Sequence, residues 1–428
     1  MPFKPTGSHS VKKNKKLMRV LLTVLVFISI ISCTSCSKSS DTLTPIVTPP
    51  TTDSFTVTVN NGYGSSKYKT GDTVHIFSIA YGDNQVFDKW SGDITYLNGP
   101  GEWHTWFIMP NKNVSFTGTL KSITPVTLQF EQIRGRDRMK PVYYYFPAGH
   151  KGFVYLLHGT SGTAQNLVNS FEFVQLYKEL VNDGFGIIVT ESEETTTGVD
   201  ANADGKLRWL VSPADSVNNV DYANIKIITD TFYNRGITNR SKLRYCVGMS
   251  NGGNFAAYLS DYFKYKAAVS YCAPAGVAAL TTVTPLQFCM ARFDNNENVG
   301  PAGNAAALSN SQLITSRGYC SKYFINERAP LYAERFARRG DITVAKSTAI
   351  FNELKSKGFL DSKNYFKGFI DVFTTAYQAN PASFPEYNSL TILQRLFVNE
   401  QISISVSDHH IYSDYNKATI KFLNTQCL

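Results

Sequence analysis

The chain has 428 residues, of which 43% are hydrophobic, and a formal net charge of +9. This length allows two globular cores of ordinary size. Six of the basic residues lie within the first 32 positions, which hold no acidic residue, so removing six positive charges from +9 leaves +3 for the rest of the chain. So small an excess excludes a protein that binds nucleic acid through a broad basic surface, and we predict no nucleic-acid partner.

The first 33 residues are typical of an export signal. Five basic residues between positions 12 and 19 precede the apolar run 20–31, which is shorter than the roughly 20 residues of a membrane-spanning helix. The segment ending at Cys33 resembles a bacterial lipobox, which implies lipidation of Cys33, with Cys36 as the alternative. We therefore expect an exported lipoprotein of the outer membrane or cell surface, in contact with the membrane through its N-terminal lipid only.

Residues 34–53 are rich in Ser, Thr and Pro, a composition that cannot bury a core and predicts a linker. A small all-β module is expected over residues 54–121. It begins with Phe55, Val57 and Val59, which alternate as in a half-buried strand.

Three segments of this module are similar to the divergent bacterial repeats first described in internalin-type surface proteins: residues 68–74, 87–92 and 107–114. The resemblance implies a spacer or an adhesive unit. Its tryptophans are expected in the core rather than on a sugar-binding surface: Trp90, Trp103 and Trp106.

Residues 127–428 read as strands that alternate with helices, which favours a mainly parallel sheet covered on both faces. Residues 142–146 are expected to open the sheet as an antiparallel strand, and residues 220–233 to form a helix. The other predicted strands are residues 152–157, 185–190, 243–247, 267–271, 286–290 and 402–406.

The pentapeptide Gly248-Met249-Ser250-Asn251-Gly252 lies between an apolar strand pattern and the helix-compatible residues 254–260. This is the setting of a nucleophile elbow, a sharp strand-to-helix turn that holds a serine hydroxyl clear of its neighbours. Small residues at positions 248 and 252 let such a turn close. The sequence therefore predicts Ser250 as a nucleophile.

The strand at 152–157 stops at His158-Gly159-Thr160, where an oxyanion loop is expected. In sheets with a nucleophile elbow, the oxyanion is held by the amide after the nucleophile and by an amide of this upstream loop. The predicted donors are the amides of Asn251 and Thr160. His158 is expected to brace the loop.

The chain has seven histidines, one of which is expected to act as the general base. The order nucleophile, acid, histidine leaves only His409 and His410. We favour His410, because His410-Ile411-Tyr412 resembles the histidine, any residue, aromatic pattern common after the last strand. His409 is the alternative.

The carboxylate that orients the general base is expected in the loop after the strand at 286–290. Asp294 is the first carboxylate of that loop and is predicted to orient the imidazole. Asp408 is too close in sequence to the histidines for that role.

The runs 157–164 and 247–253 resemble secreted esterases related to polyhydroxybutyrate depolymerases and feruloyl esterases, over residues 127–428. The resemblance implies an α/β-hydrolase fold and a Ser-Asp-His triad that works through an acyl-enzyme. Residues 290–294 lack the His-Gly that usually precedes the acid in that family. The long stretch before the histidines implies a helical cap at about 300–395, with helices at 330–338, 344–357 and 389–397.

A metal and a disulfide are weaker predictions. Asp200, Asn202 and Asp204 have the spacing of half a calcium loop, but a polar turn is the preferred interpretation, and no cofactor is expected. Cys320 and Cys427 could pair in an oxidising compartment, which the sequence alone leaves open.

The sequence thus predicts an exported serine esterase that acts as a monomer. Its expected substrates are feruloyl or acetyl esters of glycans, or polyesters. The alternatives are a serine peptidase of the same fold and a non-catalytic surface glycan-binding lipoprotein.

Overall fold

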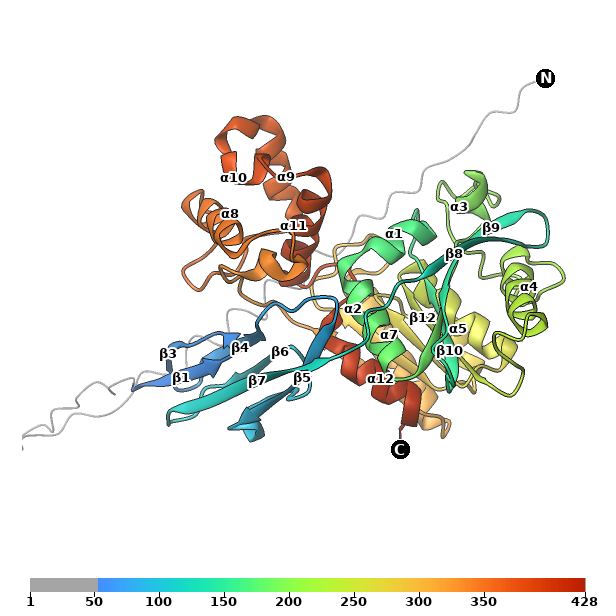
Figure 1. Ribbon diagram of the computed structural model, residues 1–428, viewed down its shortest axis with the longest axis horizontal. Coiled ribbons are helices and arrows are strands. Elements are labelled where there is room, and N and C mark those ends of the chain that lie inside the picture. The colour runs from blue at the N-terminus through green and yellow to red at the C-terminus, as the bar shows by residue number, and fades with distance from the viewer. Residues whose placement is uncertain (1–52, 428) are drawn as a thin grey trace, which may run out of the picture. The chain divides into compact units, whose positions relative to one another are not determined.

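The computed structural model describes residues 53–427, so the predicted export signal and lipidation cysteines, and all of the linker but its last residue, lie outside the described residues. The described chain forms a β module, a sheet with helices on both faces, and a helical insertion (Figure 1). Within residues 53–427, no helix has both the length and the apolar composition to span a membrane.

The β module has two small sheets, in the orders β3-β1-β7-β5 and β2-β4-β6. Val57 and Val59 are buried in its core, as predicted for a half-buried strand, and so are Trp90 and Trp103. Trp106, also expected in the core, is only half-buried. The elements of the module are β1 (Ser54–Asn60), β2 (Gly62–Tyr63), β3 (Ser66–Lys69), β4 (Thr73–Ser78), β5 (Gln85–Gly92), η1 (Ile94–Tyr96), β6 (His104–Ile108) and β7 (Val114–Ser122).

The second sheet has eight strands in the order β15-β14-β13-β12-β10-β11-β9-β8. β9 runs antiparallel to both neighbours, and the other neighbouring pairs are parallel. This is the α/β-hydrolase fold, and it confirms the predicted fold class. The strands are β8 (Gln129–Arg134), β9 (Met139–Tyr145), β10 (Gly152–Leu157), β11 (Phe185–Val189), β12 (Leu243–Met249), β13 (Ala267–Tyr271), β14 (Leu286–Ala291) and β15 (Ser321–Asn326).

Both faces of this sheet are buried because successive side chains of a strand point to opposite faces. In β10, Tyr155 and Leu157 belong to one core, and Val154 and Leu156 to the other. The first core takes side chains from α4 (Val220–Asn234), α5 (Asn251–Phe263), α6 (Ala278–Thr281) and α7 (Gly300–Ser316). The second takes them from α1 (Ala164–Asn169), α2 (Phe171–Asn182) and α12 (Asn416–Thr425), and the short α3 (Glu193–Thr197) follows β11.

A helical insertion follows β15 and has a hydrophobic core of its own (orange to red in Figure 1). Phe366 and Phe373 are buried in this core, and Phe369 and Tyr377 pack against it, so these aromatic side chains are packing residues. The insertion contains η2 (Arg335–Arg339), α8 (Val344–Ser356), α9 (Ile370–Ala379), η3 (Pro381–Ser383), α10 (Pro385–Asn388) and α11 (Ile392–Ser405).

The predicted strand at 402–406 is wrong, because these residues end helix α11. Thr391 starts that helix with a capping box, in which its side chain and that of Gln394 each bind the other's backbone amide. Ile402 packs in the core of the insertion, whereas Ile404 packs in a core of the sheet. A helix buried on two sides shows apolar residues two positions apart, and this spacing imitates a strand.

The sheet instead ends with β15, which the sequence did not predict. The cap expected at about 300–395 therefore starts too early, since α7 buries Ala307 and Ile314 in a core of the sheet. The predicted helix at 330–338 is reduced to η2, whereas the one at 344–357 matches α8.

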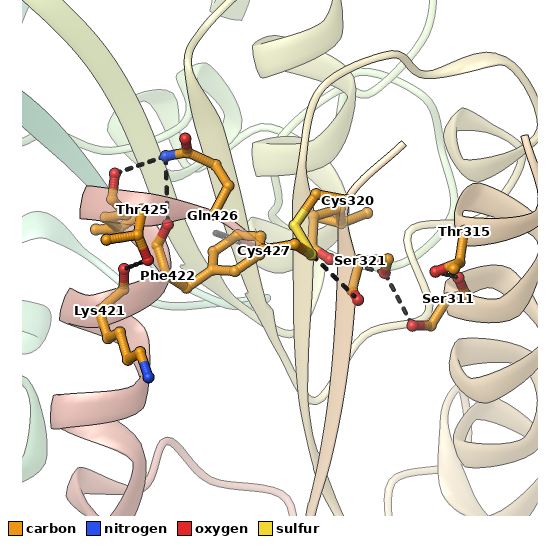
Figure 2. Close-up of a disulfide and its surroundings, with 11 residues drawn as sticks. Ser311, Thr315, Cys320, Ser321, Lys421, Phe422, Thr425, Gln426 and Cys427 are labelled. Carbon is orange, nitrogen blue, oxygen red and sulfur yellow. Dashed lines mark hydrogen bonds between the residues drawn. A yellow bond between two sulfur atoms is a disulfide. The ribbon is translucent and has the colours of Figure 1, made fainter. Parts of the chain in front are cut away.

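Cys320, directly before β15, forms a disulfide with Cys427, which follows α12 (Figure 2). The bridge joins the edge of the sheet to the C-terminal helix over a sequence separation of 107. The other described cysteines, Cys246, Cys272 and Cys289, are free and buried.

Replacing both Cys320 and Cys427 with serine is expected to lower the free energy of unfolding by about 2–4 kcal/mol, because a long closed loop restricts the unfolded chain. Urea denaturation of the variant and the wild type measures the difference. The wild type in reductant should match the variant. Equal midpoints for oxidised wild type and variant would contradict the prediction.

Candidate active site

Ser250 lies at the turn between β12 and α5, with a φ of 57° and a ψ of −126°. A Cβ added at Gly248 would lie 2.0 Å from the Gly252 carbonyl oxygen, and one at Gly252 would lie 2.3 Å from the His158 carbonyl oxygen. Both positions therefore require glycine. The positive φ of a non-glycine residue is strain held in place by the surrounding structure, as in a nucleophile elbow.

A histidine and a carboxylate meet near this turn. His409 Nδ1 lies 2.7 Å from Asp294 Oδ2, and the Asp294 side chain is fully buried. The other Asp294 oxygen accepts the Asn296 amide at 2.9 Å. Among the described residues, the buried His409 Nε2 has no hydrogen-bond partner. An imidazole held at Nδ1 by a carboxylate, with Nε2 free, can act as a general base.

The pair lies at the same end of the sheet as the serine. Tyr271, the last residue of β13, accepts the Ser250 amide at 2.8 Å. The next residue, Cys272, has its sulfur within 4.8 Å of a carboxylate oxygen of Asp294 and a ring nitrogen of His409. The ends of β12 and β14 thus place Ser250 and Asp294 at one edge of the sheet, and His409 reaches this edge through its contact with Asp294.

Cys272, Asp294 and His409 have donor atoms close enough to suggest a metal site. Burial raises the pKa of the Cys272 thiol well above its ordinary value. Cys272 Sγ donates to the His410 carbonyl at 3.1 Å, so the sulfur acts as a protonated packing group. Because metals bind the thiolate, this set is a poor metal site.

The preference for His410 over His409 is corrected by this geometry. His409, the alternative, is the histidine that faces Asp294. The His410 amide donates to the Asp408 carbonyl at 2.8 Å, so the chain turns tightly here. Tyr412 donates its hydroxyl to the same carbonyl, so the aromatic residue two positions after His410 has a structural role. Burial lowers the pKa of His410.

The two predicted oxyanion donors line one cavity with Ser250. Within residues 53–427, the amides of Thr160 and Asn251 have no backbone acceptor. A Cβ at Gly159 would lie 3.1 Å from the Ser250 Cβ, so the loop passes directly beside the serine. Two amides next to the nucleophile can stabilise a developing oxyanion.

His158 braces this loop, as predicted. Its Nε2 accepts the Ser192 amide at 3.0 Å, so Nδ1 carries the hydrogen and donates to the Gly159 carbonyl at 2.7 Å. Burial lowers the pKa of His158 to about 4, so the ring is neutral at pH 7. Its role is structural.

Sequence reasoning missed Trp209, which ties the loop to the elbow. Its indole nitrogen donates to the His158 carbonyl at 3.0 Å, and its amide donates to the Asn251 side chain at 2.8 Å. The buried ring stacks on Phe255 of α5. The signal available was a tryptophan beside Leu207 and Leu210, outside every predicted strand and helix.

The cavity above Ser250 has a volume of about 600 Å³. Its walls are the loops 160–161, 206–208 and 295–299, and Val299 is the only apolar side chain that lines it among the described residues. Two cations on the wall are neutralised: Lys206 pairs with Glu297 at 2.8 Å, and Arg208 pairs with Asp204. The cleft is polar, with its charges paired.

The weak calcium candidate is a closed polar turn. Asp200 accepts the amides of Asp204 at 3.2 Å and Gly205 at 2.6 Å, and Asn202 also accepts the Asp204 amide. Asp204 pairs with Arg208. These oxygens bind the protein itself, which supports the polar-turn interpretation.

No protein-family model and no curated protein sequence matches the chain. Among solved structures it is similar to a dienelactone hydrolase from Anabaena variabilis, at 15% identity over 47% of this chain and 87% of that one, with a TM-score of 0.36. It is also similar to an acetyl xylan esterase from Aspergillus awamori, at 14% identity over 43% and 81%, with a TM-score of 0.32. These likenesses concern the fold, and nothing about activity follows from them.

Proposed function

We propose that this protein is a serine esterase with a triad of Ser250, His409 and Asp294. The observation that carries the proposal is the 2.7 Å contact between His409 and Asp294 at the end of the sheet where Ser250 stands on a strained turn. His409 Nε2 has no hydrogen-bond partner within residues 53–427, which favours a catalytic role over a non-catalytic binding protein, because this nitrogen can accept a proton.

The proposed reaction is acyl transfer. Ser250 Oγ attacks the ester carbonyl carbon while His409 Nε2 takes the hydroxyl proton, and Asp294 holds the ring through Nδ1. The amides of Asn251 and Thr160 stabilise the oxyanion. His409 then gives its proton to the leaving alcohol as the ester bond breaks. Water, deprotonated by His409, releases the acid and restores Ser250.

The chemistry of the cleft narrows the expected substrates. Hydroxyl-rich ligands can hydrogen-bond to the side-chain amides of Asn254, Asn295 and Asn298, which line it. A feruloyl ring or a polyester chain would instead desolvate these amides without replacing their hydrogen bonds, which is unfavourable. We therefore favour short-chain acyl esters of uncharged glycans over the feruloyl and polyester alternatives and over peptides.

The proposal is tested on the soluble form that starts near Thr51, with p-nitrophenyl acetate as substrate and a fluorophosphonate as active-site probe. We expect turnover and covalent labelling, and peptide mass spectrometry should locate the label at Ser250. The absence of both turnover and labelling in a folded sample would reject the esterase and favour the glycan-binding alternative. Peptide cleavage without ester cleavage would favour the peptidase.

Replacing Asn295 with leucine is expected to lower kcat/KM for an acetylated xylo-oligosaccharide about three- to ten-fold relative to kcat/KM for p-nitrophenyl acetate, because one amide contact to the sugar is lost. Asn295 is exposed on the cleft wall, so the fold should tolerate the change. The matched control is Asn234→Leu, at the exposed end of α4. An unchanged ratio, or a preference of the wild type for methyl ferulate, would contradict the glycan assignment.

We also propose that the protein is exported and lipid-anchored, as its N-terminal pattern implies. The Cys320–Cys427 disulfide supports export, since disulfides persist in oxidising compartments. Cell fractionation of the full chain, with accessibility of intact cells to protease, tests the location. Recovery in the cytosol would reject it.

A further inference from the structure

His409 lies in the segment between α11 and α12, residues 406–415, here called the histidine loop. Two parts of the catalytic domain hold this loop. From α2, Glu172 accepts the Ser413 amide at 2.9 Å. From the helical insertion, Arg338 donates to the Ser413 hydroxyl at 3.2 Å and also binds Glu172 at 3.1 Å. All of these side chains are buried.

The β module supplies a third attachment. His104, the first residue of β6, has its Nδ1 2.6 Å from Asp414 Oδ1, and each side chain is only 7% exposed. Behind it, His75 of β4 has its Nδ1 3.0 Å from His104 Nε2. A buried carboxylate left without a partner is costly, so this contact restricts Asp414 to one position.

The module also holds the start of α12, directly after the loop. Glu102, two residues before His104, accepts the Lys417 amide at 3.3 Å and the Ala418 amide at 3.0 Å. These amides belong to the first turn of a helix, where backbone donors have no partner within the helix. Glu102 therefore supplies from the module the cap that α12 lacks in its own sequence, since its N-cap residue Tyr415 makes no side-chain cap.

A displacement of Asp414 would also move His409, because the loop is short and is held together by internal hydrogen bonds. Five positions separate the two residues, and between them Tyr412 donates its hydroxyl to the Asp408 carbonyl. The Asp408 side chain in turn accepts the His409 amide at 2.7 Å. A shift of about 1 Å in a catalytic group can cost about 100-fold in rate.

We propose that the β module is a working part of the active site, in which His104 and Glu102 position the histidine loop and hence His409. This goes beyond the spacer or adhesive role implied by the module's resemblance to surface repeats, and it rests on the esterase proposed above. His104 is a positioning residue, since it acts through Asp414 and touches neither Ser250 nor the polar cleft.

The test compares His104→Phe, which removes the donor to Asp414, with His104→Asn, whose amide can still donate from about the place of Nδ1. Turnover of p-nitrophenyl acetate is measured per active site, counted by fluorophosphonate titration. We expect His104→Phe to lower kcat about ten-fold with KM within two-fold, and to slow fluorophosphonate labelling in parallel. His104→Asn should recover most of the loss. Unchanged kcat per titrated site in His104→Phe would overturn the proposal.

Val57→Ala distinguishes a positioning role of the module from a purely structural one. Val57 is 1% exposed, so this substitution opens a cavity in the core of the module and destabilises it without touching the histidine loop. This variant should lower the melting temperature and leave kcat per titrated site unchanged, whereas a loss like that of His104→Phe would overturn the proposal. Should His104→Phe not fold, kcat per titrated site is compared between the wild type and Asp414→Asn, which changes the shape of the side chain little. Wild-type turnover tests the esterase itself, so the two proposals fail separately.

Discussion

Replacing Ser250 with alanine is expected to lower kcat for p-nitrophenyl acetate by about 10⁵- to 10⁶-fold, because the attacking oxygen is lost and no acyl-enzyme forms. The amides of Asn251 and Thr160 and the polar cleft stay in place, so a small rate above the uncatalysed reaction should persist. Fluorophosphonate labelling should disappear. Initial rates at high enzyme concentration, with labelling followed by mass spectrometry, measure both effects.

The fold should survive this change, since alanine differs from serine only by the hydroxyl oxygen and the backbone at position 250 is held by neighbouring elements. The melting temperature of the Ser250→Ala protein is therefore expected to match that of the wild type. Ser316→Ala, at the exposed end of α7, is the matched serine control. Wild-type rates in Ser250→Ala would place the nucleophile elsewhere.

The nucleophile elbow could be predicted from the sequence because its requirements are local. A buried strand, two glycines that admit no Cβ and a helix that starts at once leave few other conformations for residues 243–263. Asp294 is placed by the same reasoning, since the first carboxylate after β14 lies at the edge of the sheet that carries Ser250. These features depend on short stretches of chain.

The choice between His409 and His410 could not be made in this way. It depends on the tight turn that follows α11, and α11 itself imitates a strand because it is buried between two cores. The edge strand β15 was missed since its side chains are only half-buried and lack clear alternation. Packing between distant segments decides each of these cases.

The attachment of the β module to the histidine loop could not be predicted from the sequence at all. His104 and Asp414 are 310 positions apart, and neither belongs to a recognisable pattern. A lone histidine in a small β module is most simply read as a core residue. Their contact links a segment before the catalytic domain to the loop that carries His409.

Replacing His409 with glutamine is expected to lower kcat for p-nitrophenyl acetate by about 10⁴- to 10⁶-fold, whereas His410→Gln should lower it by less than about ten-fold. His409 binds Asp294 through Nδ1, and in the described part of the chain its Nε2 has no partner. His410 contributes its backbone carbonyl, which accepts the Cys272 thiol and is kept by any substitution. The two adjacent variants differ in position alone, so each controls for the other.

The melting temperature of each variant separates loss of catalysis from loss of folded protein in this pair. The His410 side chain is half-buried, so His410→Gln should show its main effect as a lower melting temperature, with kcat per titrated site close to that of the wild type. His409→Gln should keep its melting temperature and lose labelling. The reverse outcome, with turnover lost only in His410→Gln, would restore His410 as the base and require the histidine loop to rearrange when substrate binds.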